Sequence, residues 1–210
     1  VDAATDINIE DMIVEEDMVV TVSHEGYVKR SPAALYRTQK RGGRGRTSAK
    51  TRGEDFVEHV FLASTHSYLL FFTNRGRVYW KRVHELPQGS PTTRGKAIVN
   101  LLSLDPGEKV SAFLPVREFA EGRFVLFATA RGIVKKTGLA EYSRPRPSGI
   151  IAINLDEGDE LIAASRTTGS QEIIIATCSG KSVRFAETDV RPMGRGARGV
   201  RGMRLAKGHR

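Results

Sequence analysis

The segment from Gln39 to Arg52 combines closely spaced glycines with cations, a pattern that suits contact with phosphate. No acidic residue interrupts it, and its chemistry resides in Gln39, Lys40, Arg41, Gly42, Gly43, Arg44, Gly45, Arg46, Lys50 and Arg52. Glycine lets backbone amides approach an anion without obstruction by a Cβ atom, and arginine offers paired donors to phosphate oxygens. The segment therefore predicts a phosphate-contacting loop. A solvated or Arg-Gly-rich disordered tract is the alternative.

Further cations recur after short glycine turns and in the segments that connect those turns. Each of them taken alone is more often a solvated side chain than a contact. As a recurring set they predict contacts to phosphate that are weakly sequence-specific and sensitive to salt. The set comprises Lys29, Arg30, Arg77, Lys81, Arg82, Arg94, Lys96, Lys135, Lys136, Arg144, Arg146, Arg184, Arg195, Arg198 and Arg201.

The composition favours a polyanion as the partner. The 210 residues contain 33 Lys and Arg against 24 Asp and Glu, a formal net charge of +9, and a positive field of this kind attracts nucleic acid. Hydrophobic residues make up 40% of the chain, which argues for a packed core and against general disorder. One cysteine, Cys178, excludes an internal disulfide framework. Every apolar stretch is far shorter than the roughly 20 residues of a membrane helix, so we expect a cytoplasmic protein with no membrane partner.

The cations belong to a sequence unit that recurs about four times. Each copy has an apolar strand, a short polar turn that ends in glycine, and a second strand with basic residues. The turn glycines are Gly26, Gly76, Gly132 and Gly180, which lie 50, 56 and 48 residues apart. β-Branched and aromatic residues before each glycine predict four β-hairpins in which the glycine has a positive φ.

Two more strands per unit are expected between the hairpins. One strand precedes each later hairpin and is assigned to it (59–64, 109–115 and 160–165), and another lies in the connecting segments (97–101, 150–155 and 200–205). Four strands per repeat of about 50 residues are typical of propeller blades. The sequence thus predicts an all-β, propeller-like fold of four-stranded antiparallel blades, in a single domain over 1–210 with approximate repeats 7–56, 57–105, 106–155 and 156–205.

Charge is expected to separate within this fold. Residues 69–96 carry mostly cations, whereas residues 97–122 and 156–160 carry mostly acids. If equivalent segments occupy equivalent places in the blades, the cations form one track along the rim and the acidic loops lie apart from it. Such a track would fit a bent duplex.

Several motifs together resemble the C-terminal domain family of the DNA gyrase A protein. The segment 39–45, placed after residues 26–30 and the Leu35-Tyr36 pair, is similar to the signature box in that family's first blade. The family's domain has six blades, whereas this chain supplies about four. Similar stretches cover essentially the whole chain and are residues 76–79, 98–102, 128–132, 134–137, 158–162 and 199–202.

The resemblance implies a β-pinwheel, a relative of the propeller whose blades exchange outer strands and whose basic rim wraps double-stranded DNA with positive writhe. It implies a place in bacterial DNA gyrase at the nucleoid, together with the rest of the gyrase A protein and with the gyrase B protein, where the holoenzyme introduces negative supercoils. No cofactor is expected in this domain, because the whole enzyme uses ATP and Mg²⁺ at other domains. The alternatives are the C-terminal domain of the corresponding topoisomerase IV protein, whose box is usually degraded, and a propeller scaffold for protein partners.

No residue pattern predicts a catalytic centre. Gly194–Gly199 has the spelling GxGxxG but opens no helix in a βαβ unit, and Gly180-Lys181-Ser182 lacks the first glycine of a phosphate-binding loop. The five histidines are scattered, and HExxH and GxSxG spellings do not occur. A propeller enzyme would need polar groups that converge on a central channel. We expect neither catalytic residues nor a bound metal.

Overall fold

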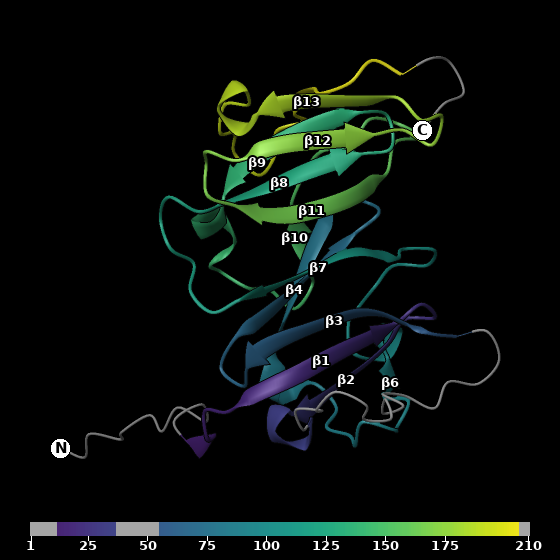
Figure 1. Cartoon of the computed structure of the whole chain (residues 1–210), viewed down its shortest axis with the longest axis vertical. Coiled ribbons are helices and arrows are strands. Elements are labelled where there is room, and N and C mark those ends of the chain that lie inside the picture. Colours follow the sequence, from purple (N-terminus) through teal and green to yellow (C-terminus); the bar gives the residue numbers. More distant parts are fainter. Residues whose placement is uncertain (1–11, 37–54, 206–210) are drawn as a thin grey trace, which may run out of the picture. The chain divides into compact units, whose positions relative to one another are not determined.

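A computed structural model describes residues 12–36 and 55–205. These residues form β-strands joined by turns and short 3-10 helices, and no α-helix occurs among them. The prediction of an all-β chain is confirmed (Figure 1). Two compact units are present: Val1–Leu69 with Lys81–Leu102 is unit 1, and Leu70–Trp80 with Ser103–Arg210 is unit 2. The expected single domain and its repeat boundaries stay predictions.

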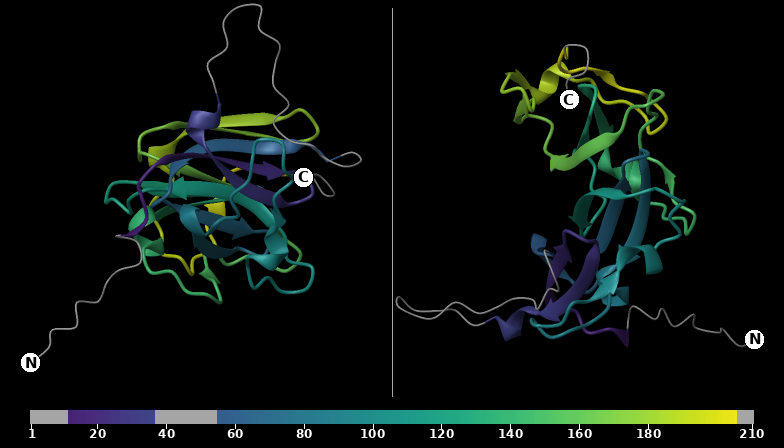
Figure 2. Two further views of the ribbon diagram at one scale, coloured as in Figure 1. Left: turned by 90° about the horizontal axis from the view of Figure 1, so that it is seen from below. Right: turned by 90° about the vertical axis from the view of Figure 1, so that its right-hand side faces the viewer.

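Unit 1 contains one four-stranded antiparallel sheet in the order β3-β1-β2-β6. Its strands are β1 (Asp17–Ser23), β2 (Tyr27–Pro32), β3 (Val57–Ser64) and β6 (Lys96–Ala97), and Figure 2 shows them from two further sides. Met18, Val20 and Val22 alternate along β1 and are fully buried or nearly so, and Thr21 and Ser23 on the opposite face are buried too, so both faces of this strand are covered in its second half. The 3-10 helices of this unit whose bounds lie within the described residues are η2 (Ala33–Leu35), η3 (Val83–Glu85) and η4 (Ile98–Asn100).

Unit 2 contains two four-stranded sheets and one hairpin, except that the outer ends of β4 and β5, Tyr68-Leu69 and Lys81-Arg82, are counted in unit 1. The first sheet has the order β10-β5-β4-β7, with β4 (Tyr68–Thr73), β5 (Arg77–Arg82), β7 (Val110–Val116) and β10 (Ile150–Ile151). The second has the order β11-β8-β9-β14, with β8 (Phe124–Thr129), β9 (Ile133–Gly138), β11 (Leu161–Thr167) and β14 (Val200–Arg201). The hairpin pairs β12 (Glu172–Ala176) with β13 (Ser182–Ala186), and the 3-10 helices are η5 (Leu139–Tyr142) and η6 (Glu187–Asp189).

Aromatic rings form the centre of the core in unit 2. Phe72 lies edge-on to Phe127, with ring centroids 5.3 Å apart, and edge-on to Tyr142 at 6.0 Å. All three side chains are completely buried, so the geometry is the favourable T-shaped one in a dry environment.

One edge strand of each four-stranded sheet lies further along the sequence than the next hairpin. Strand β6 follows the hairpin β4–β5 but pairs with β2, so that Ala97 lies opposite Tyr27. Strand β10 pairs with β5 and β14 pairs with β9 in the same way. This is the strand exchange that the resemblance implies. Each exchanged strand has only two residues, and β6 ends where the chain turns into η4 and buries Ile98.

We expected the strand before each later hairpin to pair with the hairpin that follows it, and this expectation is wrong. Strand β3 pairs with β1, whose hairpin precedes it, and β11 pairs with β8 in the same manner. Each sheet therefore draws strands from two consecutive sequence repeats. The alternation of apolar residues identifies such a strand but does not select the hairpin on which it pairs.

Two series of glycines shape the chain. The four turn glycines have φ between 73° and 81°, as predicted. A second series precedes the exchanged strands: Gly95, Gly149 and Gly199, with φ of 92°, 69° and 103°. A Cβ atom would lie 2.5 Å from the Val28 carbonyl oxygen at Gly95 and 2.5 Å from the Val134 carbonyl oxygen at Gly199. These positions admit only glycine because both the backbone conformation and the space forbid a side chain.

Candidate nucleic-acid interface

Three segments between a 3-10 helix and an exchanged strand carry five of the predicted cations outside the box, and Lys96 and Arg201 stand beside these segments. We call them connector 1 (residues 86–95), connector 2 (143–149) and connector 3 (190–199). The box, with Gln39–Gly45, Arg46, Lys50 and Arg52, lies outside the described residues, so its phosphate contacts stay a prediction. Connector 1 belongs to unit 1, and connectors 2 and 3 belong to unit 2.

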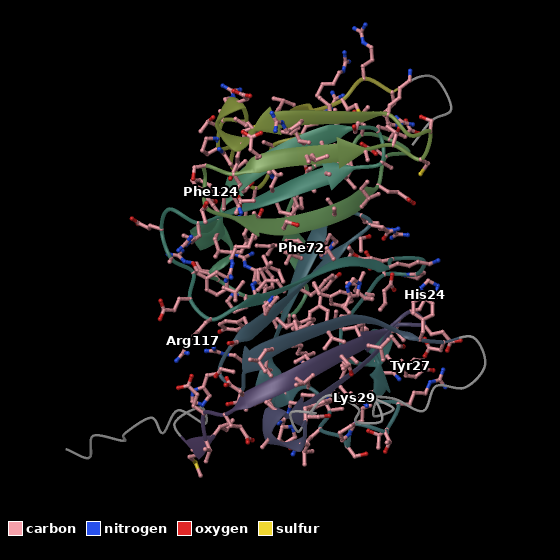
Figure 3. All side chains as sticks on the ribbon, in the orientation of Figure 1. His24, Tyr27, Lys29, Phe72, Arg117 and Phe124 are labelled. Atoms are coloured by element: carbon pink, nitrogen blue, oxygen red, sulfur yellow. The ribbon has the colours of Figure 1, made fainter. Side chains whose placement is uncertain are left out.

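Connector 1 is held against β2 by a lysine. The Lys29 ammonium donates to the carbonyl oxygens of Ser90, Pro91 and Thr93 at 3.1, 2.6 and 2.6 Å. Lys29 is only 2% exposed, and burial lowers the pKa of its amine. Figure 3 labels Lys29 and Tyr27, which both lie on β2. The three donors of an ammonium thus match three acceptors of the connector.

Connector 3 is held against β9 in the same way. The Lys135 ammonium donates to the carbonyl oxygens of Arg195, at 2.5 Å, and of Ala152, at 2.7 Å. The pKa of Lys135 is lowered to about 8, chiefly by burial and also by the positive charge of Arg195, while Glu141 acts in the opposite direction. The neighbouring Lys136 donates to the carbonyl oxygen of Glu187 at 2.9 Å.

The prediction that these three lysines touch DNA must be corrected. Lys29, Lys135 and Lys136 are 2%, 0% and 4% exposed, and their ammonium groups are bound to backbone carbonyls. They could reach a phosphate only by leaving these acceptors unsatisfied, which is costly for buried groups. Their recurrence in the sequence reflects a shared structural task.

Backbone hydrogen bonds reinforce the attachment of both connectors. The Arg30 amide donates to the Pro87 carbonyl at 2.9 Å, and the Gly89 amide donates to the Arg30 carbonyl at 3.0 Å. In connector 3, the Met193 amide donates to the Lys136 carbonyl at 2.8 Å. Connectors 1 and 3 therefore share one arrangement in two different sheets.

Several connector cations form ion pairs with acids of the same unit. Arg94 stacks over the Tyr27 ring at 3.7 Å and pairs with Glu25. Arg195 lies 3.8 Å from Glu141, and Arg198 pairs with Asp156. The exposed members of the predicted set on or beside the connectors are Lys96, Arg144, Arg146, Arg198 and Arg201.

The cations of the hairpin strands are mostly half-buried and bound to their surroundings. The Arg30 Nε atom donates to the Leu86 carbonyl oxygen at 2.9 Å, and Arg82 stacks over Tyr68 while donating to the His66 carbonyl oxygen at 2.5 Å. Arg77 donates to the Ser148 carbonyl oxygen, and Lys81 lies 3.8 Å from Glu85. Arg184, by contrast, is exposed and lies 3.4 Å from Glu172. Whether any of them touches DNA stays a prediction.

The acidic loops do not stand apart from the cations. Arg75, in the turn of the β4–β5 hairpin, lies 4.0 Å from Asp105 and donates to the Pro106 carbonyl oxygen. In the next hairpin, the Arg131 amide donates to Asp159 at 3.0 Å. The expected separation of charge is therefore wrong at these loops, which fold back onto hairpin turns.

Sequence reasoning missed some exposed cations. Arg75 and Arg131 both stand directly before a turn glycine, and this recurrence is a signal that could have found them. Lys181 directly follows the turn glycine Gly180, as Arg77 follows Gly76. The other exposed cations outside the predicted set are Lys109, Arg117, Arg123, Arg166, Arg191 and Arg204.

No group of three His, Cys, Asp or Glu side chains that could hold a metal ion was found in residues 12–36 and 55–205. No helix in this part of the chain is both long and apolar enough to cross a membrane.

Known proteins are similar to this chain over nearly its whole length. The family described as "DNA gyrase C-terminal domain, beta-propeller" matches residues 17–64, 67–117, 123–168 and 171–210. The DNA gyrase A protein of Salmonella typhimurium is 53% identical over 203 residues, which cover 97% of this chain and 23% of that protein. The DNA gyrase A protein of Clostridium acetobutylicum is 48% identical over 200 residues, or 95% of this chain and 24% of that protein. The chain thus spans less than a quarter of the length of these two relatives.

Solved structures agree. A C-terminal domain of DNA topoisomerase IV superposes with a TM-score of 0.80 at 33% identity, covering 94% of this chain and 60% of that one. A DNA gyrase A C-terminal domain superposes with a TM-score of 0.70 at 25% identity, covering 92% and 62%.

Proposed function

We propose that this chain, which belongs to the DNA gyrase C-terminal domain family, binds and wraps double-stranded DNA through the cations of its connectors. The observation that carries the proposal is the shared attachment of connectors 1 and 3. In each connector, a buried lysine and a glycine with positive φ fix a short segment of backbone. Lys96 is exposed next to connector 1, and Arg198 is exposed on connector 3. Arg94 and Arg198 both stand directly before the glycine that opens an exchanged strand, and cations that recur at one place in a repeat suit contact with phosphate.

The charge of the molecule supports DNA over a protein partner. The net charge of +9 is carried largely by arginine, which contacts phosphate through two donors at once. Contacts of this type position a duplex without reading its sequence, so sequence preference would come from the ease of bending the DNA. A scaffold for protein partners would instead show weak DNA binding at moderate salt.

The whole protein would act as the A protein of a bacterial gyrase in the cytoplasm. In this proposal the chain bends DNA with positive writhe, and the rest of the gyrase A protein together with the gyrase B protein carries out the ATP- and Mg²⁺-dependent reaction. The identity of 53% to a gyrase protein favours gyrase. The TM-score of 0.80 to a topoisomerase IV domain is the observation that keeps that enzyme as the second candidate.

A plasmid topology assay tests the proposal. Nicked plasmid is sealed by ligase in the presence of saturating protein, and the linking number is measured after the protein has been removed. We expect a positive change in linking number that grows with protein concentration and vanishes at high salt. Binding without any change in linking number would refute wrapping, and absence of binding at moderate salt would refute the DNA module as a whole.

A further inference from the structure

The carbonyl groups that bind the two buried lysines set the direction of the backbone around them. We propose that Lys29 and Lys135 are positioning residues that turn amide groups of connectors 1 and 3 outward as phosphate-binding donors. The inference rests on the proposed DNA binding and adds to it. It assigns contacts to the backbone amides of Thr92, Arg94 and Gly196, and it assigns the buried lysines a role in DNA binding without direct contact.

The argument starts from peptide geometry in connector 1. A trans peptide is planar, so its carbonyl and its amide point in opposite directions, and the described residues contain no cis peptide bond. The Pro91 and Thr93 carbonyls point at the Lys29 ammonium, at 2.6 Å each. The amides of the same two peptide units, which belong to Thr92 and Arg94, must therefore point away from β2. Thr92 is exposed, so the connector presents donors to an approaching anion.

Connector 3 has the corresponding arrangement. The Arg195 carbonyl points at the Lys135 ammonium, at 2.5 Å, so the Gly196 amide points away from β9. Gly196 is exposed, and an added Cβ atom would meet nothing within 4 Å. The same holds for Gly194, and neither glycine has a positive φ. The fold of the described chain therefore requires glycine at neither position, whereas close approach of a ligand to the backbone would.

The chemistry of the anchors supports a positioning task. A methionine would fill much of the space of Lys29 or Lys135 without the cost of burying an ammonium. Burial lowers the pKa of both amines, and the charge of Arg195 opposes protonation of Lys135 as well. An ammonium at these places imposes one orientation on the facing carbonyls, which an apolar side chain cannot do. That orientation also fixes the amides on the opposite side.

Connector 2 serves as an internal comparison. Tyr79 occupies the place of the lysine on β5, and it packs against Gly149, where an added Cβ atom would lie 2.8 Å from the ring. The neighbouring Trp80 donates through its indole nitrogen to the Tyr142 carbonyl at 2.9 Å. Arg77 donates to the Ser148 carbonyl of this connector, but the amide of the same peptide unit, that of Gly149, donates to the Arg146 carbonyl at 2.9 Å and so is not presented to an anion. We expect connector 2 to contact DNA through the side chains of Arg144 and Arg146 rather than through anchored amides.

The first experiment measures how duplex affinity depends on salt. The variants Lys29→Met and Lys135→Met are compared with Val20→Ala and Val125→Ala, which lose buried methyl groups in β1 and β8 away from the connectors. All are titrated with a fluorescent duplex at several salt concentrations, at matched folded fraction. Release of a connector should remove the phosphate contacts of its cations, so the magnitude of the slope of log K against log salt should fall by about 0.9 for each phosphate no longer contacted. The valine variants should keep the wild-type slope, since a purely structural loss does not remove phosphate contacts from the folded molecules.

The second experiment needs no variant and therefore does not depend on the folding of the lysine mutants. Amide resonances of the wild-type chain are followed by NMR during titration with the same duplex. The resonances of Thr92, Arg94 and Gly196 should shift strongly, and the backbone amides of connector 2 should shift less.

Unchanged slopes in both methionine variants, or unshifted Thr92, Arg94 and Gly196 amides at saturation, would overturn the positioning role. Failure of the wild-type chain to bind the duplex would overturn the proposed function instead. The two failures are therefore distinguishable.

Discussion

Replacement of Gly199 by alanine should detach strand β14 from its sheet. The residue has a φ of 103°, and an added Cβ atom would lie 2.5 Å from the Val134 carbonyl oxygen and 2.9 Å from the Cγ2 atom of Ile133. A side chain in the left-handed region costs about 1–2 kcal/mol. Forcing an additional methyl group into a filled space costs about 1–3 kcal/mol more. The free energy of unfolding should therefore fall by roughly 2–5 kcal/mol, a large part of the 5–15 kcal/mol that is usual for a domain.

Urea and thermal unfolding of Gly199→Ala measure this loss, with Gly194→Ala as the matched control. An added Cβ atom at Gly194 meets nothing within 4 Å, and φ there is not positive, so the control should be unchanged or stabilised by up to about 1 kcal/mol. A loss of about 2 kcal/mol or more in Gly199→Ala should lower Tm by at least about 4 °C in a chain of this size. An unfolding free energy within about 0.5 kcal/mol of wild type, the usual range for harmless surface changes, would refute the reasoning that the close approach of β14 requires glycine.

Three further predictions concern charge. The pKa of Lys135 is about 8 in the folded chain and its ordinary value is 10.5, so the unfolded chain binds more protons between these two pH values. The unfolding free energy of wild type, measured by urea titration at each pH, should therefore rise from about pH 8 to pH 10.5 relative to that of Lys135→Met. Parallel curves of unfolding free energy against pH for the two proteins would contradict the buried amine. Asp156→Asn should raise duplex affinity, because it removes the carboxylate that competes for Arg198, while changing stability by less than about 1 kcal/mol; titration and urea unfolding check both effects, and an unchanged affinity would count against Arg198 as a contact. Replacement of Arg41, Arg44 and Arg46 in the box by alanine should abolish the linking-number change in the plasmid assay and leave salt-sensitive binding. Retention of full wrapping would contradict the role of the box.

The hairpins could be predicted because their signals are local. A glycine that must adopt positive φ, preceded by β-branched and aromatic residues, specifies a turn within a few residues, and Gly26, Gly76, Gly132 and Gly180 all have the expected conformation. The pairing of the remaining strands is not local. Strand β3 alternates suitably for either neighbouring hairpin, and only the packed molecule selects β1. Contacts between residues that are far apart in the chain leave no comparable local pattern in a single sequence.

The lysines show the same limit at the candidate site. Lys29 and Lys135 stand at the third residue after a turn glycine, and a lysine in a polar, basic stretch is normally exposed. Their burial depends on connectors 1 and 3, in which the carbonyl oxygens of Ser90 and Arg195 accept their hydrogen bonds. These acceptors lie 60 residues or more further along the chain. Exposed cations such as Lys96, Arg144 and Arg198 needed no such partner, and their exposure followed from the polar, glycine- and proline-rich composition of the connectors.

The strand exchange determines where the cations of the connectors lie. Each connector reaches back to the sheet of the preceding hairpin and enters it through Gly95, Gly149 or Gly199. The cations beside these glycines are therefore positioned by the sheet they join and not by the hairpin that they follow in the sequence. A substitution that releases an exchanged strand should move its cations as well, so the detachment of β14 in Gly199→Ala should be accompanied by a loss of DNA affinity. Hydrogen exchange at the Val134 and Val200 amides, measured together with duplex affinity across the urea titration, separates this coupling from a direct effect of the substitution on DNA contact.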